Sequence, residues 1–421
     1  MQRLRHLLIG GLLVVGYFAG LPPHAWQPAP SFAVPAAATV APDETASWRA
    51  LAASDADTPL VHAAAAAELP DGRLQAVWFA GSREGAGDVA IHGAVFDPAS
   101  GQWSDERVLV DRPQLMAGLG LYVRKLGNAV LHVDADGRMR MFVVAVSFGG
   151  WGASRIAVIE SADGGVTWES PMLLQTSPFL NISYLVKGAP ISYDDGSIGL
   201  PVYHELAGKF GELLRIDADN RVLSRARIGH GRAAIQPSII VTGAQQATAF
   251  LRNTRDQRDD GIWRSDSEDA GRHWSPLRGT GEPNPNAAVS ALALDAQHWL
   301  LAANCNARFR DDLCLKVTQD AGQHWQLLTM FHDRTALRAL SPDSDLLKAR
   351  LGEELAQTDG VDDAAAVLAR AERNKCRDDS CEFQYDYPFM LRTRNGDVHI
   401  LYTWNKSLVR HYWWPANGEA R

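Results

Sequence analysis

The sequence predicts an all-β protein, a six-bladed β-propeller with a helical insertion in the last blade. Three observations predict this fold. A hairpin pattern recurs six times, and a short aspartate-containing turn recurs between hairpins. Successive copies of each pattern are separated by roughly 50 to 65 residues or by a multiple of this, apart from one longer gap before the last hairpin. A blade of four short strands occupies about 50 residues, so six blades account for most of the 421 residues.

The composition is that of a globular protein. Hydrophobic residues make up 46% and charged residues 21% of the chain, which excludes wholesale disorder and a collagen-like structure. The formal net charge is −8. A chain this acidic lacks the overall positive field that attracts nucleic acids, so we expect no nucleic-acid partner.

Residues 1–38 are predicted to be a signal peptide or an N-terminal anchor, followed by a linker. Two arginines precede an apolar run over residues 7–21, which two prolines end. This run is shorter than a full membrane span and is typical of a signal peptide. Cleavage near the small residues 36–38 would release the protein, whereas an uncleaved segment would anchor it in the membrane. Either outcome predicts an exported protein, periplasmic or secreted.

The propeller is predicted over residues 50–421. Two kinds of repeating unit support it, and the first is a β-hairpin. Each copy has an apolar strand, a tight polar turn and a second apolar strand, and most turns carry the Asp-Gly or Asn-Gly pair that supplies positive φ. A β-sandwich of similar strand count is the competing fold. The six turns centre near Asp71, Asp136, Asp195, Gly243, Asp295 and Asn395.

The second repeat is a turn of the form [S/T]-x-D-x-G-x-[T/H]-W. It occurs at residues 161–168, 267–274 and 318–325, with a degraded copy at 97–103. The aspartate can accept hydrogen bonds from N–H groups of its own turn, the glycine adopts positive φ, and the tryptophan packs the turn onto the blade. We therefore expect these turns to stabilise the blades and to lie away from any catalytic site.

Residues 335–383 interrupt the last hairpin period. Ala, Leu, Glu and Arg dominate two stretches of this segment, which predicts two helices. The insertion is either a lid over a central pocket or a surface decoration.

The four cysteines form two local pairs, Cys305 with Cys314 and Cys376 with Cys381. In an oxidising compartment such pairs indicate two disulfides that each close a short loop. The second pair would fix the return of the insertion to the propeller. A four-cysteine zinc site is the alternative, but these spacings differ from the C-x2-C pattern of such sites. We therefore expect disulfides and no metal.

The aspartate turns resemble the Asp-box, or BNR, repeats of sialidases. Together with the six hairpins they make the chain resemble the sialidase superfamily over residues 55–415. The stretches WFAGSREGAGDVAI and SYLVKGAPISYDDGSIGLPVYHE are similar to bacterial BNR-repeat sialidase-like proteins, described as predicted neuraminidases. The resemblance implies three arginines that clamp a substrate carboxylate, a tyrosine nucleophile activated by a glutamate, and an aspartate acid/base.

Residues near three strand ends match the catalytic roles that the resemblance implies. Asp88, in the loop after the second strand of the first hairpin, matches the acid/base. Tyr387, at the start of the sixth hairpin, matches the nucleophile, with Tyr385 as an alternative because alternation along a strand puts both on one face. Glu205 matches the activating glutamate, and His204 beside it is a further candidate for a direct role.

The arginine clamp is only partly matched. Arg252 corresponds to one arginine, whereas His62 stands where the family has its first. Other polar residues beside strand ends should converge on the same funnel, because all blades reach it at equivalent points. Cations and amides suit an anionic sugar, and a tryptophan can stack on its ring. The remaining predicted contacts are Arg83, Glu84, Lys125, Asn128, Lys187, Gln236, Asn286, Trp404 and Lys406.

These features predict an exported exo-glycosidase of sialidase type that acts on a terminal anionic sugar of a glycan or polysaccharide and needs no cofactor. Two alternatives stay open. A polysaccharide lyase on a uronate-containing glycan would use Tyr387 or His204 on the proton beside the carboxylate, and its product would absorb in the near ultraviolet. A non-catalytic propeller would bind glycan without turnover.

Overall fold

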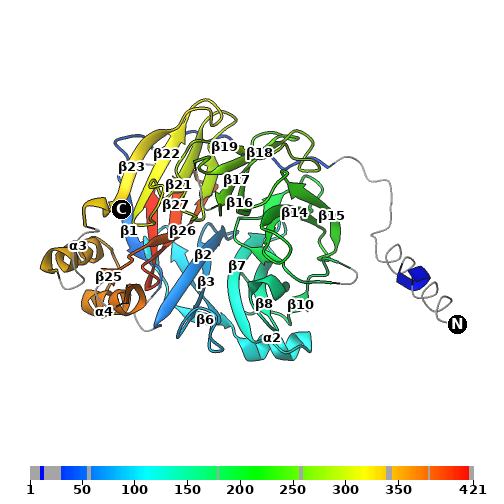
Figure 1. Cartoon of the computed structure of the whole chain (residues 1–421), viewed down its shortest axis with the longest axis horizontal. Helices are drawn as coiled ribbons and strands as arrows, with labels where there is room; N and C mark the ends of the chain where they lie inside the picture. The colour runs from blue at the N-terminus through cyan, green and yellow to red at the C-terminus, as the bar shows by residue number, and fades with distance from the viewer. Residues whose placement is uncertain are drawn as a thin grey trace.

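Six β-sheets around a central axis make up the computed structural model of the chain (Figure 1). Each sheet has four or five strands, and a separate two-stranded sheet belongs to the insertion. The predicted six-bladed propeller is therefore confirmed, and the sandwich alternative is excluded. The structure describes residues 10–13, 30–54, 58–177, 180–255, 259–337, 344–377 and 380–416.

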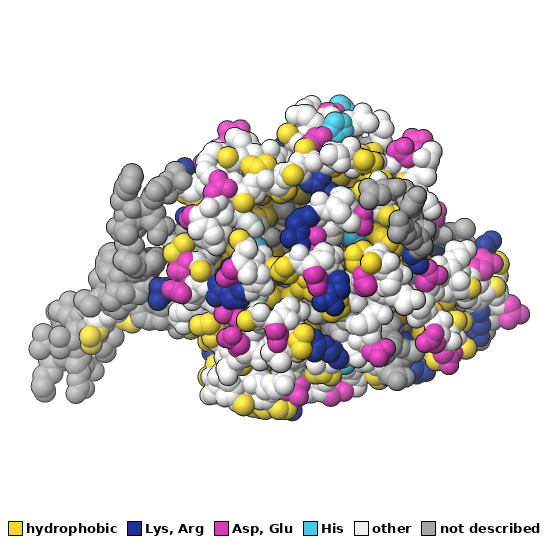
Figure 2. Space-filling model, turned by 180° about the vertical axis from the view of Figure 1, so that it is seen from behind, with side chains coloured by type: hydrophobic (Ala, Val, Ile, Leu, Met, Phe, Trp, Pro, Cys, Tyr) yellow, Lys and Arg dark blue, Asp and Glu magenta, His cyan; other side chains and the backbone are white. Residues whose placement is uncertain are grey.

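Each blade is an antiparallel sheet built largely from consecutive strands. In the first two blades the second strand is buried along its whole length, because both faces of an inner strand pack against neighbouring blades. This burial explains why these strands are continuous apolar runs. On the face seen in Figure 2, basic and acidic side chains are interspersed.

The first three blades contain the strands between residues 60 and 228, with one helix between the first and second blades. A single-turn 3-10 helix, Trp151–Ala153, precedes the third strand of the second blade. These elements are β2 (Leu60–Glu68), β3 (Leu74–Gly81), β4 (Ala90–Asp97), β5 (Gln102–Trp103) and β6 (Arg107–Val110); α2 (Arg112–Leu119); β7 (Lys125–Val133), β8 (Met139–Val146), β9 (Ser154–Ser161) and β10 (Met172–Leu173); β11 (Leu185–Val186), β12 (Ile191–Ser192), β13 (Ile198–His204), β14 (Phe210–Ile216) and β15 (Val222–Ile228).

The last blade closes the ring with a strand from the N-terminal side of the propeller. There β1 (Arg49–Ala52) pairs with β28 as the outer strand. The blade therefore joins the two ends of the propeller in one sheet. The strands of the last three blades are β16 (Ala234–Val241), β17 (Ala247–Asn253), β18 (Trp263–Ser267) and β19 (Arg278–Gly279); β20 (Ser290–Ala293), β21 (Trp299–Ala303), β22 (Asp312–Thr318) and β23 (Gln326–Asp333); β26 (Tyr385–Arg392), β27 (Val398–Trp404) and β28 (Leu408–Trp414) with β1.

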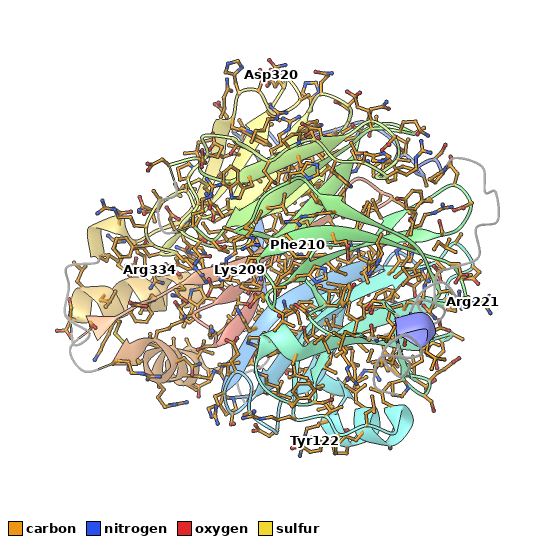
Figure 3. All side chains as sticks on the ribbon, turned by 45° about the vertical axis from the view of Figure 1, so that its right-hand side comes forward. Tyr122, Lys209, Phe210, Arg221, Asp320 and Arg334 are labelled. Atoms are coloured by element: carbon orange, nitrogen blue, oxygen red, sulfur yellow. A yellow bond between two sulfur atoms is a disulfide. The ribbon has the colours of Figure 1, made fainter. Side chains whose placement is uncertain are left out.

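The aspartate turns have the predicted structure. Asp163 accepts hydrogen bonds from the amide and hydroxyl groups of Thr167 at 2.6 to 3.1 Å, and Gly165 has a φ of 85°. Asp269 and Asp320 make equivalent bonds in the other two full copies. Each turn joins the third and fourth strands of its blade, and Figure 3 shows Asp320 at the outer edge of the molecule. The turns therefore lie far from the axis, in keeping with a structural role.

The insertion lies between β23, the last strand of the fifth blade, and β26, the first strand of the sixth. It contains the two predicted helices, α3 (Asp345–Ala356) and α4 (Ala364–Lys375), and a hairpin of β24 (Cys376–Arg377) and β25 (Ser380–Cys381). A 3-10 turn, Thr335–Leu337, begins the segment. Figure 1 shows both helices together at one edge of the propeller.

Glu354 of α3 fastens the insertion to the sixth blade. Its carboxylate accepts hydrogen bonds from Tyr385 Oη at 2.7 Å and Trp404 Nε1 at 2.8 Å, and it pairs with Arg334 at 2.8 Å. Burial alone would raise the pKa of Glu354, but its contact with His332, whose Nδ1 lies 3.2 Å from the carboxylate, and those with Arg334 and Trp404 hold it well below its ordinary value. The insertion is thus anchored through a buried polar network.

The chain before β1 is docked on the outside of the propeller. Phe32 is fully buried, and its ring centroid lies 4.9 Å from that of Tyr193. The amide of Phe32 donates to Ala244 O at 2.8 Å, and that of Ala38 donates to Leu294 O at 2.7 Å. These contacts join the hairpin turns of the third, fourth and fifth blades, so a cut near residues 36–38 would remove a buried side chain from the fold.

Of the segment 1–38, predicted to be a signal peptide or anchor with a linker, the structure describes only residues 10–13 and 30–38. Within the described ranges, no helix is long and apolar enough to cross a membrane. The predicted disulfides are confirmed: Cys305 pairs with Cys314 and Cys376 with Cys381. The zinc alternative is therefore wrong, because every cysteine is bonded to another.

Candidate active site

The first strands of several blades bend where they reach the axis. Register shifts interrupt the pairing of β2, β7, β16 and β26 with their neighbours. Gln236 and Tyr387, which lie in two of these bends, have φ values of 55° and 58°, and Asn286, before β20, has a φ of 59°. Residues other than glycine seldom adopt this backbone conformation, and a bulge re-aims a side chain. The strained backbone at these three residues therefore sets the direction of their side chains.

A cavity of about 100 Å³ lies where four blades meet. Pockets that enclose a whole small molecule are larger, about 300 to 1,000 Å³, so this cavity suits one part of a sugar. Five predicted site residues border it: His62, Glu84, Asn128, Glu205 and Tyr387. The other bordering residues are Phe79, Val144, Trp151, Leu185 and Tyr203.

Hydrogen bonds connect Tyr387 to the fourth and fifth blades. Gln236 Nε2 donates to the phenolic oxygen of Tyr387 at 2.8 Å, and Gln236 Oε1 accepts from Arg252 Nη1 at 3.1 Å. Arg252 Nε in turn donates to Asn286 Oδ1 at 2.7 Å. Because the phenolic oxygen accepts the bond from Gln236, its own proton is directed to another acceptor, and Glu205 borders the same cavity.

A second arginine, absent from the predicted set, reaches this place from the fifth blade. Arg310 donates to the backbone oxygen of Asn286 and, at 3.1 Å, to Asp386 Oδ1. Burial alone would raise the pKa of Asp386, but the charges of Arg310 and Lys375 hold it well below its ordinary value. Arg252 and Arg310 therefore meet at Asn286 and bring two guanidinium groups to the site, of which that of Arg310 is paired with Asp386.

His62 stands at the place of the missing arginine but is neutral. It is 4% exposed, its Nδ1 lies 3.1 Å from Thr403 Oγ1, and its ring centroid lies 4.3 Å from that of Tyr387. Burial lowers the pKa of His62 to about 3, so the imidazole carries no charge at neutral pH. His62 can shape the cavity and form hydrogen bonds, but it does not replace an arginine electrostatically.

Glu84 is the carboxylate of the first blade that borders the cavity. Lys406 Nζ donates to Glu84 Oε2 at 2.7 Å. Burial alone would raise the pKa of Glu84, but its electrostatic interactions with His62 and with Lys406 together keep the pKa below its ordinary value. Asp88, the predicted acid/base, instead accepts hydrogen bonds from Ser82 N at 3.0 Å and Ser82 Oγ at 2.9 Å and borders a separate hollow with Arg112. The loop closes on itself and turns Asp88 away from the cavity.

Neighbouring residues at the end of β13 face different environments. Glu205 borders the cavity. His204 Nε2 lies 3.3 Å from Glu212 Oε2, and its ring stacks on Phe210 with centroids 4.3 Å apart. Alternation at the strand end explains the difference, and it places His204 away from the cavity.

Two predicted lysines lie in different surroundings. Lys125 Nζ lies 3.9 Å from the ring centroid of Trp151, a cation–π contact at the cavity wall. Lys187 is buried, and its Nζ donates to the backbone oxygens of Pro388 and, at 3.4 Å, Val289. Burial lowers the pKa of Lys187 to about 7. Lys187 thus ties three blades together near the axis and offers little surface to a ligand.

Tyr385 and Trp404 lie outside the cavity. Both are fully buried and donate to Glu354 of the insertion. The expected alternation of Tyr385 and Tyr387 on one face is wrong, because the bulge in β26 falls at Tyr387 and interrupts the pleat. Arg83 is exposed on the loop of the first blade and does not border the cavity.

Arg310 could have been found from the cysteine pattern. The residues predicted for the site stand directly at strand ends, and β21 ends at Ala303. Arg310 lies further along, in the loop that the Cys305–Cys314 disulfide closes. A disulfide across a strand-connecting loop brings both ends of that loop together, which would have indicated that later residues return toward the axis.

The assembled groups suit the binding of a carboxylate and nucleophilic attack by a phenol. They comprise a tyrosine, two carboxylates bordering the cavity, and two arginines linked to it through Gln236 and Asn286. Within the described part of the chain, no cluster of three or more His, Cys, Asp or Glu side chains is placed to hold a metal ion.

Comparison with known proteins identifies the family. The model of the BNR repeat-like domain matches residues 72–400, so the chain belongs to this family. A comparison with curated proteins finds no match.

Solved structures share the fold at low sequence identity. A protein of unknown function from Dyadobacter fermentans is 13% identical, with a TM-score of 0.61, and the match covers 87% of this chain and 97% of that one. The NanB sialidase of Streptococcus pneumoniae is 11% identical, with a TM-score of 0.58 and coverage of 87% and 70%. The intramolecular trans-sialidase of Ruminococcus gnavus is 11% identical, with a TM-score of 0.56 and coverage of 89% and 98%. These similarities show a sialidase-like propeller.

Proposed function

We propose that the protein is an exported exo-glycosidase of sialidase type that removes a terminal anionic sugar from a glycan or polysaccharide. The observation that carries this proposal is the setting of Tyr387, which a bulge presents to a cavity shared with Glu205 and which Gln236 links to Arg252. Membership of the BNR repeat-like family and the sialidase-like fold support the class. Two disulfides support export, because they are typical of oxidising compartments.

Binding of the substrate would depend on two arginines. Arg252 and Arg310 can each donate two parallel hydrogen bonds to a carboxylate once they exchange a protein partner for the ligand. Their present bonds to Asn286 keep both guanidinium groups in place before the ligand arrives. With His62 neutral, the clamp carries two charges, so the carboxylate is held less strongly than in a site with three arginines.

The chemistry would proceed in two displacement steps. Tyr387 Oη bonds to the anomeric carbon while the bond to the leaving oxygen breaks, and Glu205 takes the phenolic proton. Water then attacks the same carbon, the bond to Tyr387 breaks, and Glu205 returns the proton to the phenolic oxygen. Glu84 would protonate the leaving oxygen in the first step and take a proton from water in the second. Because the pKa of Glu84 is lowered, its carboxylate is ionised at neutral pH, so it is ready to act as a base in the second step and must take up a proton before it can act as the acid of the first.

The test is incubation of purified protein with sialosides, uronosides and anionic bacterial polysaccharides, followed by measurement of released sugar and near-ultraviolet absorbance. We expect a released terminal sugar without new absorbance. Release accompanied by absorbance would reassign the protein as a lyase. Glycan binding without turnover of any of these substrates would reassign it as a binding propeller.

A further inference from the structure

A second, larger pocket of about 500 Å³ lies between the fifth blade and the insertion. One wall is the loop segment 308–311, and the other is formed by α3 and the segment 381–384. The Cys305–Cys314 disulfide closes the loop of the first wall, and Cys381 of the second wall is bonded to Cys376. Both disulfides of the protein therefore brace this pocket.

Arg310 joins this pocket to the candidate active site. It lines the pocket and also donates to Asp386 and to the backbone of Asn286. Pro285 and Gln384 also line the pocket, and each lies within three residues of a side chain in the candidate site. A glycan whose terminal sugar occupies the cavity would therefore have its next unit near this pocket.

A buried guanidinium group lies on the inner side of the pocket. Arg334 lines it and is 3% exposed, and its Nη1 has no hydrogen-bond partner among the described residues. Arg334 shares the single carboxylate of Glu354 with Arg410, at 2.8 and 3.9 Å, so one positive charge is not balanced within this group. Arg308 adds an exposed guanidinium at the rim. Figure 3 labels Arg334 where the helices of the insertion meet the propeller.

The other lining groups suit a sugar ring. Phe309 is 49% exposed and Phe383 is buried, and both line the pocket, so aromatic rings are available for stacking. Asp311, Glu382 and Gln384 supply oxygen atoms that can accept hydrogen bonds from sugar hydroxyl groups. These two carboxylates would repel a highly charged ligand such as a polyphosphate, so a sugar with a single carboxylate fits best.

We propose that this pocket binds a carboxylate-bearing sugar unit adjacent to the unit held in the cavity, and that the protein therefore recognises at least two units of an acidic glycan. The adjacency rests on the proposed function, whereas binding in the pocket does not require turnover. The insertion then has a role that differs from both sequence expectations, since it forms one wall of a binding site.

The experiment is calorimetric titration of the full protein with sodium glucuronate, with glucose and acetate as probes of the ring and the carboxylate alone. We expect glucuronate to bind at least tenfold more tightly than either probe. Arg308→Ala and Phe309→Ala should each weaken glucuronate binding by about 5- to 10-fold, equivalent to roughly 1 to 1.4 kcal/mol. Both residues are exposed, so these variants should fold, and thermal melting checks this.

The matched control is Arg221→Ala, whose side chain is 75% exposed and which lies on the opposite side of the molecule in Figure 3. It should bind glucuronate like the wild type. The proposal is overturned if glucuronate does not bind, if it binds both pocket variants as tightly as the wild type, or if glucose or acetate binds equally well. Glucuronate binding that depends on Arg308 without any glycan turnover would contradict the proposed glycosidase and leave the pocket assignment intact.

Discussion

At the scale of single residues, direction decides which side chains reach the cavity. Glu205 and His204 are neighbours in sequence, yet only Glu205 borders the cavity. Tyr387 and Tyr385 are two residues apart, and the bulge sends one to the axis and the other to Glu354. Residue type and position along the strand do not fix these directions without the backbone geometry.

The role of Glu205 can be separated from that of its neighbour. Glu205→Gln keeps the size of the side chain but removes the base for the phenolic proton, so kcat should fall by about 10²- to 10⁴-fold. His204→Gln should retain turnover close to the wild type, because His204 contacts Glu212 and Phe210. Steady-state kinetics on a hydrolysed substrate measure both. Equal losses in the two variants would contradict the assigned directions.

Lys406 should control the pH dependence through Glu84. Its charge helps hold the pKa of Glu84 below the ordinary value. Lys406→Met removes that charge, so the pKa of Glu84 should rise. If Glu84 acts as a base, activity is lost as pH falls through its pKa, and the acidic limb of the kcat profile should move to higher pH, by up to about one unit. A limb that stays in place or moves to lower pH would contradict a basic role for Glu84.

At the scale of elements, the propeller is held together by segments outside its regular strands. Glu354 on α3 ties the insertion to the sixth blade, and Phe32 ties the N-terminal segment to the third. The composition of the insertion predicted its two helices. They did not predict these anchors, because a buried glutamate or a single phenylalanine has no periodic signature.

Replacing Glu354 should destabilise the protein. Glu354→Gln leaves two buried arginines without their carboxylate, and we expect the free energy of unfolding to fall by about 3 kcal/mol at neutral pH. Because the pKa of Glu354 is below its ordinary value of 4.5, this stabilisation is present above that pH and is lost as pH falls toward the folded pKa. Urea denaturation at several pH values measures it.

Glu353 on the same helix is the matched control. Its side chain is 56% exposed and pairs with Arg350 at 2.8 Å, and exposed pairs contribute at most about 1 kcal/mol. Glu353→Gln should therefore change stability little. A similar loss in both variants would show that helix propensity, and not the buried network, governs the effect.

The N-terminal segment is predicted to be part of the folded unit. Phe32→Ala should lower the free energy of unfolding by about 3 kcal/mol, as for other buried phenylalanines. Val34→Ala, at a side chain 49% exposed, should change it by less than about 0.5 kcal/mol. Chemical denaturation of both variants, in protein that retains residue 30 onward, makes the comparison. Equal stability of the two variants would mean that Phe32 contributes nothing to the fold.

At the scale of the whole molecule, repetition made the fold predictable. Each blade repeats the same hairpin, and three blades repeat a full aspartate turn, so errors in one copy do not obscure the pattern. The closing strand β1 has only four residues and no turn signal. Its pairing in the last blade is therefore visible in the structure and not in the sequence. The site was less predictable, because it depends on the conformation of loops. The loop closed by the Cys305–Cys314 disulfide carries Arg310. In the loop of the first blade Asp88 bonds to Ser82, and Glu84 borders the cavity in its place.

The central claim is that Tyr387 acts as a nucleophile at the axis of the propeller. The most direct measurement compares the release of terminal sugar by the wild type and by Tyr387→Phe on the same set of anionic glycosides. The phenylalanine keeps the ring beside His62 and removes only the hydroxyl group that Gln236 contacts. We expect release by the wild type and a loss of at least about 10³-fold in the variant. Release by the variant at the wild-type rate would show that Tyr387 is not the nucleophile.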